Sequence, residues 1–219
     1  YFDFSGYADM AVGIGLMLGI ILPINFNTPF RATTMVEFWK RWHITMTRFF
    51  MMYLYSPIAL SITRQVMERG YSGIPAFTLT IAIPIGLTFL LSGLWHGAAW
   101  TFVAFGAVNA VGLIINHTWR QAKLPPFPTV VSWFLTMATV IVSFVYFRAE
   151  SIANAHAILL AMATPQDIIL PNWLASFAVH VDLPWRTLNF FSSGSYTLRL
   201  TSWIGVLFII SILPLKQIK

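Results

Sequence analysis

Residues 70–119 read GYSGIPAFTLTIAIPIGLTFLLSGLWHGAAWTFVAFGAVNAVGLIINHTW, and these fifty positions contain no Asp, Glu, Lys or Arg. A helix needs roughly 20 apolar residues to cross about 30 Å of hydrocarbon, because each residue adds about 1.5 Å. The stretch is therefore long enough for two membrane spans. Its glycine-rich centre, Ser92–Gly97, marks the break, so we predict helices near residues 74–94 and 98–115.

Three further charge-free stretches predict spans in the same way, near residues 7–24, 130–147 and 201–214. The composition agrees, since 58% of the residues are hydrophobic and 9% are charged, against about 45–50% and 25% in ordinary soluble domains. The sequence therefore predicts an all-α, multi-pass transmembrane helical bundle with about five spans. We expect residues 1–219 to form a single membrane domain, the later part of a longer polypeptide.

Charge and cysteine content exclude several classes of protein. The net charge of +6 is gathered in patches rather than spread over a polar domain, which excludes a nucleic-acid-binding protein. The chain has no cysteine and can form neither a disulfide nor a thiolate metal site. No two histidines have the i, i+4 spacing of a zinc-binding helix face, and we expect no metal site.

The distribution of Lys and Arg predicts the orientation. With alternating spans, residues 25–73, 116–129 and 216–219 share one side and carry ten of the basic residues, against three in residues 148–200. The positive-inside rule places the first set in the cytoplasm.

The 25–73 segment also contains an expected amphipathic helix. Thr34 and Glu37 fit a capping box, and apolar residues recur at helical spacing from Met35 to Tyr53. Glu37 and Arg41 pair at i, i+4. We expect this helix to lie at the cytoplasmic interface or to dip in beside the bundle, and a second, weaker one to run near residues 151–163.

His96 is the leading candidate for chemistry, because an ionisable residue within an apolar stretch is costly and marks a functional site by default. The alternative is a neutral imidazole that only joins two helices. Ser92 precedes it by four residues and could form a nucleophile pair with it if the helix were continuous, which Gly93 and Gly97 argue against.

Two other residues are secondary candidates. His43 lies at the edge of the amphipathic helix, where an interfacial histidine is the simpler reading. Asp9, near the start of the first span, is either a carboxylate that meets the helix dipole or a residue with a coupling role.

Four motifs occur in a fixed order and carry a resemblance. They are residues 1–13 (YFDFSGYADMAVG), 22–33 (LPINFNTPFRAT), 37–48 (EFWKRWHITMTR) and 91–100 (LSGLWHGAAW). Over roughly residues 1–165 the chain resembles the membrane-bound O-acyltransferase (MBOAT) family, in particular its bacterial branch similar to alginate O-acetyltransferase and the D-alanyl transferase of teichoic acids.

The resemblance implies a many-helix membrane fold with a tunnel, placed in the bacterial inner membrane. It implies transfer of an acyl group, acetyl first, from a cytoplasmic thioester (acetyl-CoA or an acyl carrier protein) toward the hydroxyls of an extracytoplasmic polysaccharide, together with an extracytoplasmic acyltransferase partner. It places the family's invariant His on His96 and its second common His on His43. No bound cofactor is expected.

A mechanism follows from this assignment. Neutral His96 is expected to act as general base on the acceptor hydroxyl, with His43 orienting a substrate. Lys40, Arg41 and Arg48 offer charge to a phosphate-bearing donor, and Trp95, Ser92 and Asp9 complete the candidate binding residues.

The acceptor stays open, because Met51-Met52 and Pro57–Arg64 depart from the pattern of the alginate branch. D-alanyl or longer acyl transfer is an alternative within the family. A membrane transporter or a scaffold without acyl-transfer activity is the alternative from another class.

Overall fold

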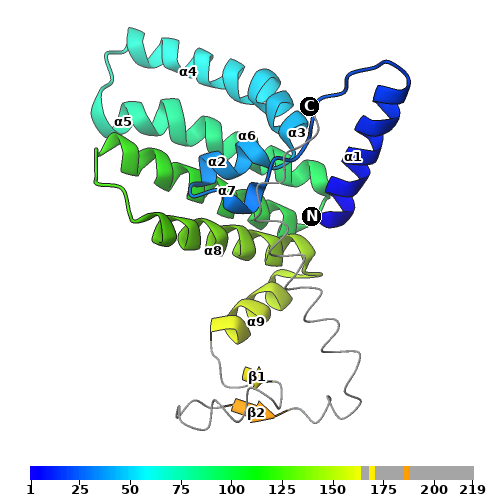
Figure 1. Ribbon diagram of the computed structural model, residues 1–219. Coiled ribbons are helices and arrows are strands. Elements are labelled where there is room, and N and C mark those ends of the chain that lie inside the picture. The colour runs from blue at the N-terminus through cyan, green and yellow to red at the C-terminus, as the bar shows by residue number, and fades with distance from the viewer. Residues whose placement is uncertain (164–167, 171–184, 188–219) are drawn as a thin grey trace.

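The computed structural model describes residues 1–163 in full and the backbone of residues 168–170 and 185–187. These parts are helical apart from one parallel pairing of two short strands (Figure 1). The elements in chain order are α1 (Phe2–Met17), η1 (Pro29–Arg31), α2 (Met35–Arg41), α3 (Ile44–Phe50), η2 (Met51–Tyr55), α4 (Ser56–Glu68), α5 (Gly73–Phe77), η3 (Thr78–Ala82), α6 (Ile83–His96), α7 (Trp100–Gln121), α8 (Thr129–Arg148), α9 (Ile152–Ala163), β1 (Ile168–Leu170) and β2 (Trp185–Thr187). The all-α prediction is confirmed, and so is the helix expected near residues 151–163.

Three helices are long and apolar enough to cross a membrane. They are the continuous run α5–η3–α6 (Gly73–His96), α7 and α8. They match three of the five predicted spans to within six residues at each end, and the break between the first two falls at residues 97–99, at the end of the predicted glycine-rich segment. The span predicted near residues 201–214 lies outside the described residues.

The first predicted span is shorter than expected. The helix near 7–24 instead runs from Phe2 to Met17, which is about 24 Å and less than the roughly 30 Å of a hydrocarbon core. It ends because Gly19 adopts a left-handed conformation (φ 73°), while the Ile20 N–H donates back to the Gly15 carbonyl at 2.8 Å. The sequence pattern, which stays apolar through Leu22, gave no sign of this turn.

Helices α6 and α7 form a tight antiparallel pair held at two glycines. A Cβ on Gly93 would lie 2.2 Å from the Phe102 carbonyl oxygen, and one on Gly106 would lie 2.3 Å from that of Phe89. Small residues of this kind let helices in membranes approach at backbone distance. This close approach places the end of α6, where His96 lies, beside the first turns of α7.

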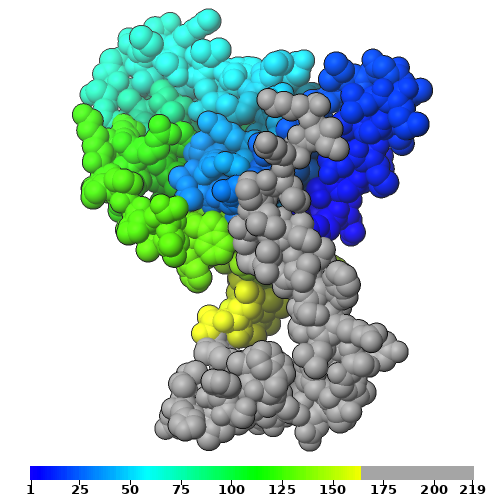
Figure 2. Space-filling model, in the orientation of Figure 1, coloured from blue at the N-terminus to red at the C-terminus, as the bar shows by residue number. Residues whose placement is uncertain are grey.

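The short helix α2 lies at the centre of the core. Its apolar residues Met35, Phe38 and Trp39 are buried and pack against residues of α6, α7 and α8. Figure 1 shows α2 crossing the long helices, and in Figure 2 the mid-blue atoms of this region fill the space between α4 and α8. Of the two placements expected for the amphipathic helix, the structure has the one beside the bundle.

The expected single helix from Thr34 to Tyr53 is wrong in one respect, because the chain breaks at Trp42 and His43. Trp42 is extended and His43 is left-handed, with φ 43°. The helix restarts at Ile44 and continues through α3, η2 and α4 to Glu68 without a gap, a length of about 37 Å.

This long helix places the two ends of the 25–73 segment at different ends of the helical bundle, although it is not among the three helices apolar enough to cross a membrane. Its start is beside the end of α6, where the rings of Phe50 and Trp95 are 6.1 Å apart, and α4 packs along η3 (Figure 1). Because α6 and α7 are antiparallel, residues 69–73 lie at the same end as the α7–α8 loop. His43 lies at the opposite end.

Candidate active site

His96 is the last residue of α6 and is surrounded by aromatic rings from α7 and α8. Its half-buried imidazole lies 6.3 Å from the ring of Phe102, 5.8 Å from that of Phe105 and 5.0 Å from that of Phe147, measured between centroids. A Cβ on Gly97 would lie 2.5 Å from the Phe102 ring, so glycine is required for this stacking. The imidazole therefore faces the bundle rather than lipid.

His43 occupies the break between α2 and α3 and is held by Asn25. The Asn25 Oδ1 atom accepts from the Thr45 backbone N–H at 3.2 Å and from the Thr45 hydroxyl at 2.9 Å, and it lies 3.1 Å from His43 Nδ1. Because this oxygen can only accept, Nδ1 of His43 carries the hydrogen. The lone pair of Nε2 is then free to act as a base or to accept a hydrogen bond.

The two histidines lie close enough to affect each other electrostatically. Burial lowers the pKa of His43, and the nearby charge of His96 lowers it further. Two like charges near each other disfavour simultaneous protonation. The helix that follows His43, α3, ends beside the end of α6, where the rings of Phe50 and Trp95 are 6.1 Å apart.

A small cavity of about 40 Å³ lies between α2, α3 and α6, and neither histidine lines it. It is lined by Trp39, Thr47, Thr88 and Ser92 among others, and the Trp39 Nε1–H has no hydrogen-bond partner among the described residues. Sequence reasoning missed Trp39, because its helical spacing marked it only as a core residue.

Contrary to the expected interruption, α6 continues through Ser92 and Gly93 to His96. Ser92 and His96 therefore share a helix face. No hydrogen bond joins the two side chains in the described part of the chain, and the Ser92 side chain is buried in the small cavity. The arrangement provides no activated serine.

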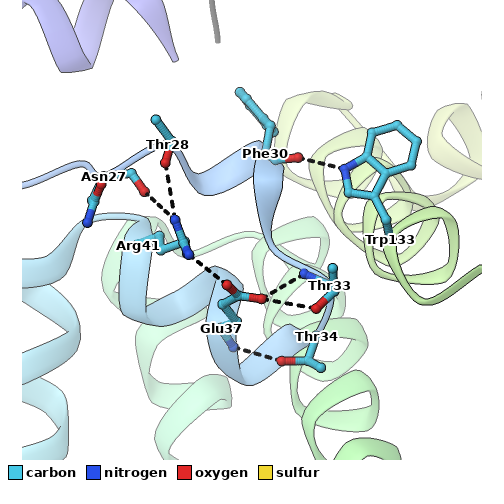
Figure 3. A network of polar contacts seen from close by, with 8 residues as sticks. All are labelled: Asn27, Thr28, Phe30, Thr33, Thr34, Glu37, Arg41 and Trp133. Atoms are coloured by element: carbon cyan, nitrogen blue, oxygen red, sulfur yellow. Dashed lines mark hydrogen bonds and ion pairs between the residues drawn. The ribbon is translucent and has the colours of Figure 1, made fainter. Parts of the chain in front are cut away.

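A polar network fixes α2 and hence the His43 break (Figure 3). The Glu37 carboxylate accepts from the Thr33 N–H at 2.8 Å and from Arg41 at 2.7 Å, while the Thr34 hydroxyl accepts from the Glu37 N–H at 3.1 Å. One of the two hydrogen bonds of the predicted capping box is present, from the Glu37 N–H to the Thr34 hydroxyl. In place of the second, the Glu37 carboxylate accepts from the N–H of Thr33 rather than that of Thr34. Burial alone would raise the pKa of Glu37, but these hydrogen bonds and Arg41 hold it below its usual value.

A second cavity, of about 610 Å³, lies between α2, α7 and α8. Its lining includes Lys40, Asn116, Trp119 and Arg120. The Asn116 Oδ1 atom accepts from the Met35 N–H at 2.8 Å, so that α7 supplies the cap at the start of α2. Neither His43 nor His96 lines this cavity.

The apolar helices agree with a comparison against known families. Residues 1–158 match the model of MBOAT, the membrane-bound O-acyltransferase family. The chain belongs to this family. Both histidines and all the candidate binding residues fall inside the matched MBOAT region.

Individual MBOAT relatives align with most of this chain but with a smaller share of their own length. The chain is 37% identical to a peptidoglycan O-acetyltransferase of Helicobacter pylori over 74% of this chain and 29% of the relative. It is 39% identical to a probable alginate O-acetylase of Azotobacter vinelandii over 78% and 32% of the two chains. It is 30% identical to a teichoic acid D-alanyltransferase of Streptococcus thermophilus over 67% and 38%. The chain aligns with about a third of the length of these relatives.

The other residues predicted to bind substrate or donor are spread over several parts of the MBOAT chain and do not form one group. Trp95 is 63% exposed, with its ring against those of Phe50 and His96. Arg41 is engaged by Glu37 and by the Thr28 hydroxyl, so its charge is already neutralised. The other three are exposed, with Lys40 at the larger cavity, Arg48 on α3 and Asp9 on α1.

Asn25 is the main residue that sequence reasoning missed. It belongs to the quoted Leu22–Thr33 motif, but no spacing rule relates it to a histidine eighteen positions later. Among residues 1–163, no three His, Asp or Glu side chains gather as a metal site would require.

Proposed function

We propose that this chain carries the histidine site of a bacterial inner-membrane O-acyltransferase. The enzyme moves an acyl group from a cytoplasmic thioester toward the hydroxyls of an extracytoplasmic polysaccharide. The observation that supports this most is that both histidines are held inside a family-matched helical bundle, His43 by Asn25 and His96 among the rings of α7 and α8.

In the proposed reaction, neutral His96 accepts the proton of the acceptor hydroxyl. The oxygen attacks the thioester carbonyl carbon, the carbon–sulfur bond breaks, and the thiolate leaves with the electron pair. His43 presents its free Nε2 to the same space and orients a substrate, because Asn25 holds the hydrogen on Nδ1. No covalent enzyme intermediate is needed.

Acetyl is the favoured acyl group, since two relatives named for O-acetylation are 37% and 39% identical to the chain, against 30% for the D-alanyltransferase. The donor is acetyl-CoA or an acyl carrier protein. An extracytoplasmic acyltransferase partner would complete the transfer to the polymer. D-alanyl transfer is the second candidate.

The test is His96→Ala in the full-length protein, with acylated polysaccharide measured by mass spectrometry. A positioned general base contributes roughly 10²–10⁴-fold, so we expect transfer to fall by at least about 100-fold. His156→Ala is the matched control, because this exposed histidine lies on α9. Near-full transfer by the His96 variant at normal membrane levels would contradict the proposal.

A parallel transport assay separates the remaining classes. A transporter would move substrate without making a covalent product. A scaffold would be indifferent to the His96 change.

A further inference from the structure

The larger cavity is separate from the histidine site. Its floor lies at Gly112, where a Cβ would meet Thr139 at 2.9 Å and Met35 at 3.2 Å. Beyond this floor, Phe38 and Leu113 belong to the buried core. Because neither His43 nor His96 lines the cavity, its occupant need not be the thioester that reacts at His96.

The rim of the cavity is positively charged. Lys40 and Arg120 are both exposed and both line it. The one acidic lining residue, Glu37, is already paired with Arg41 at 2.7 Å. Within the described lining, the uncompensated charge is therefore cationic, which suits a phosphate group.

The lower part of the cavity is apolar, and its side chains are exposed on the described part of the chain. Ile115 and Leu135 line it from α7 and α8, and their side chains are 57% and 50% exposed. The depth from Arg120 to Gly112 along α7 is about 12 Å. A volume of about 610 Å³ falls within the range of roughly 300–1,000 Å³ typical of ligand sites.

The mouth of the cavity lies at the ends of two helices that are long and apolar enough to cross a membrane. It is formed where α7 ends and α8 begins. There the rings of Trp119 and Phe127 stack at 4.7 Å, and the Trp119 indole N–H donates to the Pro125 carbonyl at 3.0 Å. Aromatic rings beside basic residues are typical of a membrane–water interface.

We propose that this cavity binds an anionic phospholipid, with its phosphate at Lys40 and Arg120 and an acyl chain against Ile115 and Leu135. Basic pockets between transmembrane helices on the cytoplasmic side are a recognised kind of anionic-lipid site. The lipid fills the space beside α2 and so supports the helix that leads to His43. This site does not depend on the identity of the acyl group or its acceptor.

The test is native mass spectrometry of the full-length protein from nanodiscs containing equal phosphatidylglycerol and phosphatidylcholine. We expect the unaltered protein to retain phosphatidylglycerol preferentially. Lys40→Gln with Arg120→Gln should reduce that preference about ten- to thirty-fold, because two cation–phosphate contacts are lost. The matched control is Arg64→Gln with Arg69→Gln, which removes two exposed charges from the α4 region outside the cavity.

A second variant tests the apolar part without changing charge. Ile115→Trp fills the cavity and should abolish retention of the lipid. Val111→Trp is its control, since Val111 lies one turn earlier on α7, is 55% exposed and does not line the cavity. Equal loss in control and test variants would overturn the proposal.

Two further outcomes would also overturn it. Displacement of phosphatidylglycerol by millimolar inorganic phosphate would show a general anion site. A higher KM for acetyl-CoA in the Lys40 and Arg120 variant, with lipid retention unchanged, would show that the cavity binds the acyl donor instead of a lipid.

Discussion

At the scale of single residues, His43 is held in a costly conformation. A left-handed backbone is uncommon for residues other than glycine and costs of order 1–3 kcal/mol when surrounding structure enforces it. Here the enforcement comes from Asn25, whose carbonyl oxygen accepts from the Ile44 N–H at 2.9 Å and whose side chain contacts Thr45 and His43. The strain fixes the direction of the imidazole before any substrate binds.

The pH dependence of His43 follows from its surroundings. Burial, and then the charge of His96, keep the pKa of His43 below the usual 6.5, so the ring stays neutral through the neutral range. We expect kcat/KM to fall only as the pH drops below about 6.5. By the same linkage, stability is full above that pH and is lost as the pH falls through the folded-state pKa.

The Asn25→Asp variant tests whether the fall in kcat/KM at low pH is due to His43. A carboxylate placed 3.1 Å from Nδ1 raises the pKa of the imidazole, so the acidic limb of the profile should move to higher pH. Asn27→Asp is the control, since Asn27 lies with Arg41 in the α2 network. An unmoved limb in the Asn25 variant would mean that His43 does not titrate in the reaction.

At the scale of elements, we expect a single methyl group added where α6 and α7 touch to lower the stability of the protein. Gly106→Ala forces a Cβ against the Phe89 carbonyl, 2.3 Å away, and backbone cannot move aside cheaply. We expect a loss of about 1–3 kcal/mol in stability, seen as a lower thermal midpoint in detergent, together with reduced acyl transfer because His96 shifts.

Gly86→Ala on α6 is the matched control, because its Cβ would meet no atom within 4 Å. It should be neutral or slightly stabilising, since alanine suits a helix better than glycine. Equal damage from both substitutions would show that helix propensity, rather than packing, explains the result.

The elements show what the sequence could and could not predict. Long apolar runs fixed α6, α7 and α8, because crossing a membrane requires length and hydrophobicity that are both visible locally. The break at His43 was not visible, since it depends on Asn25, which approaches from another segment. His96 was predicted from its place in an apolar stretch and the resemblance then added weight to both histidines, whereas their surroundings required the fold.

At the scale of the whole molecule, the direction of the Ile44–Glu68 helix sets the topology. Residues 69–73 lie at the end of the α7–α8 loop, opposite Ala98. The chain lacks cysteine, so single introduced thiols can report which face each position occupies. We expect Arg69→Cys and Lys123→Cys to react with an impermeant maleimide from one side of sealed vesicles, and Ala98→Cys from the other.

The cytoplasmic side is expected to be that of Arg69, Arg120 and Lys123, by the positive-inside rule. Labelling of Arg69→Cys and Lys123→Cys from opposite sides would contradict the arrangement of helices described above. Labelling of all three from one side would contradict it too.

The backbone contacts at Gly93 and Gly106 also restrict how substrates come and go. Two helices joined at carbonyl distance move as a single body, so no gate can open between them. On the amino-terminal side, the rings of Phe4 of α1 and Phe26 lie against His43. We therefore expect access to His43 to depend on motion of this amino-terminal segment rather than on separation of α6 from α7.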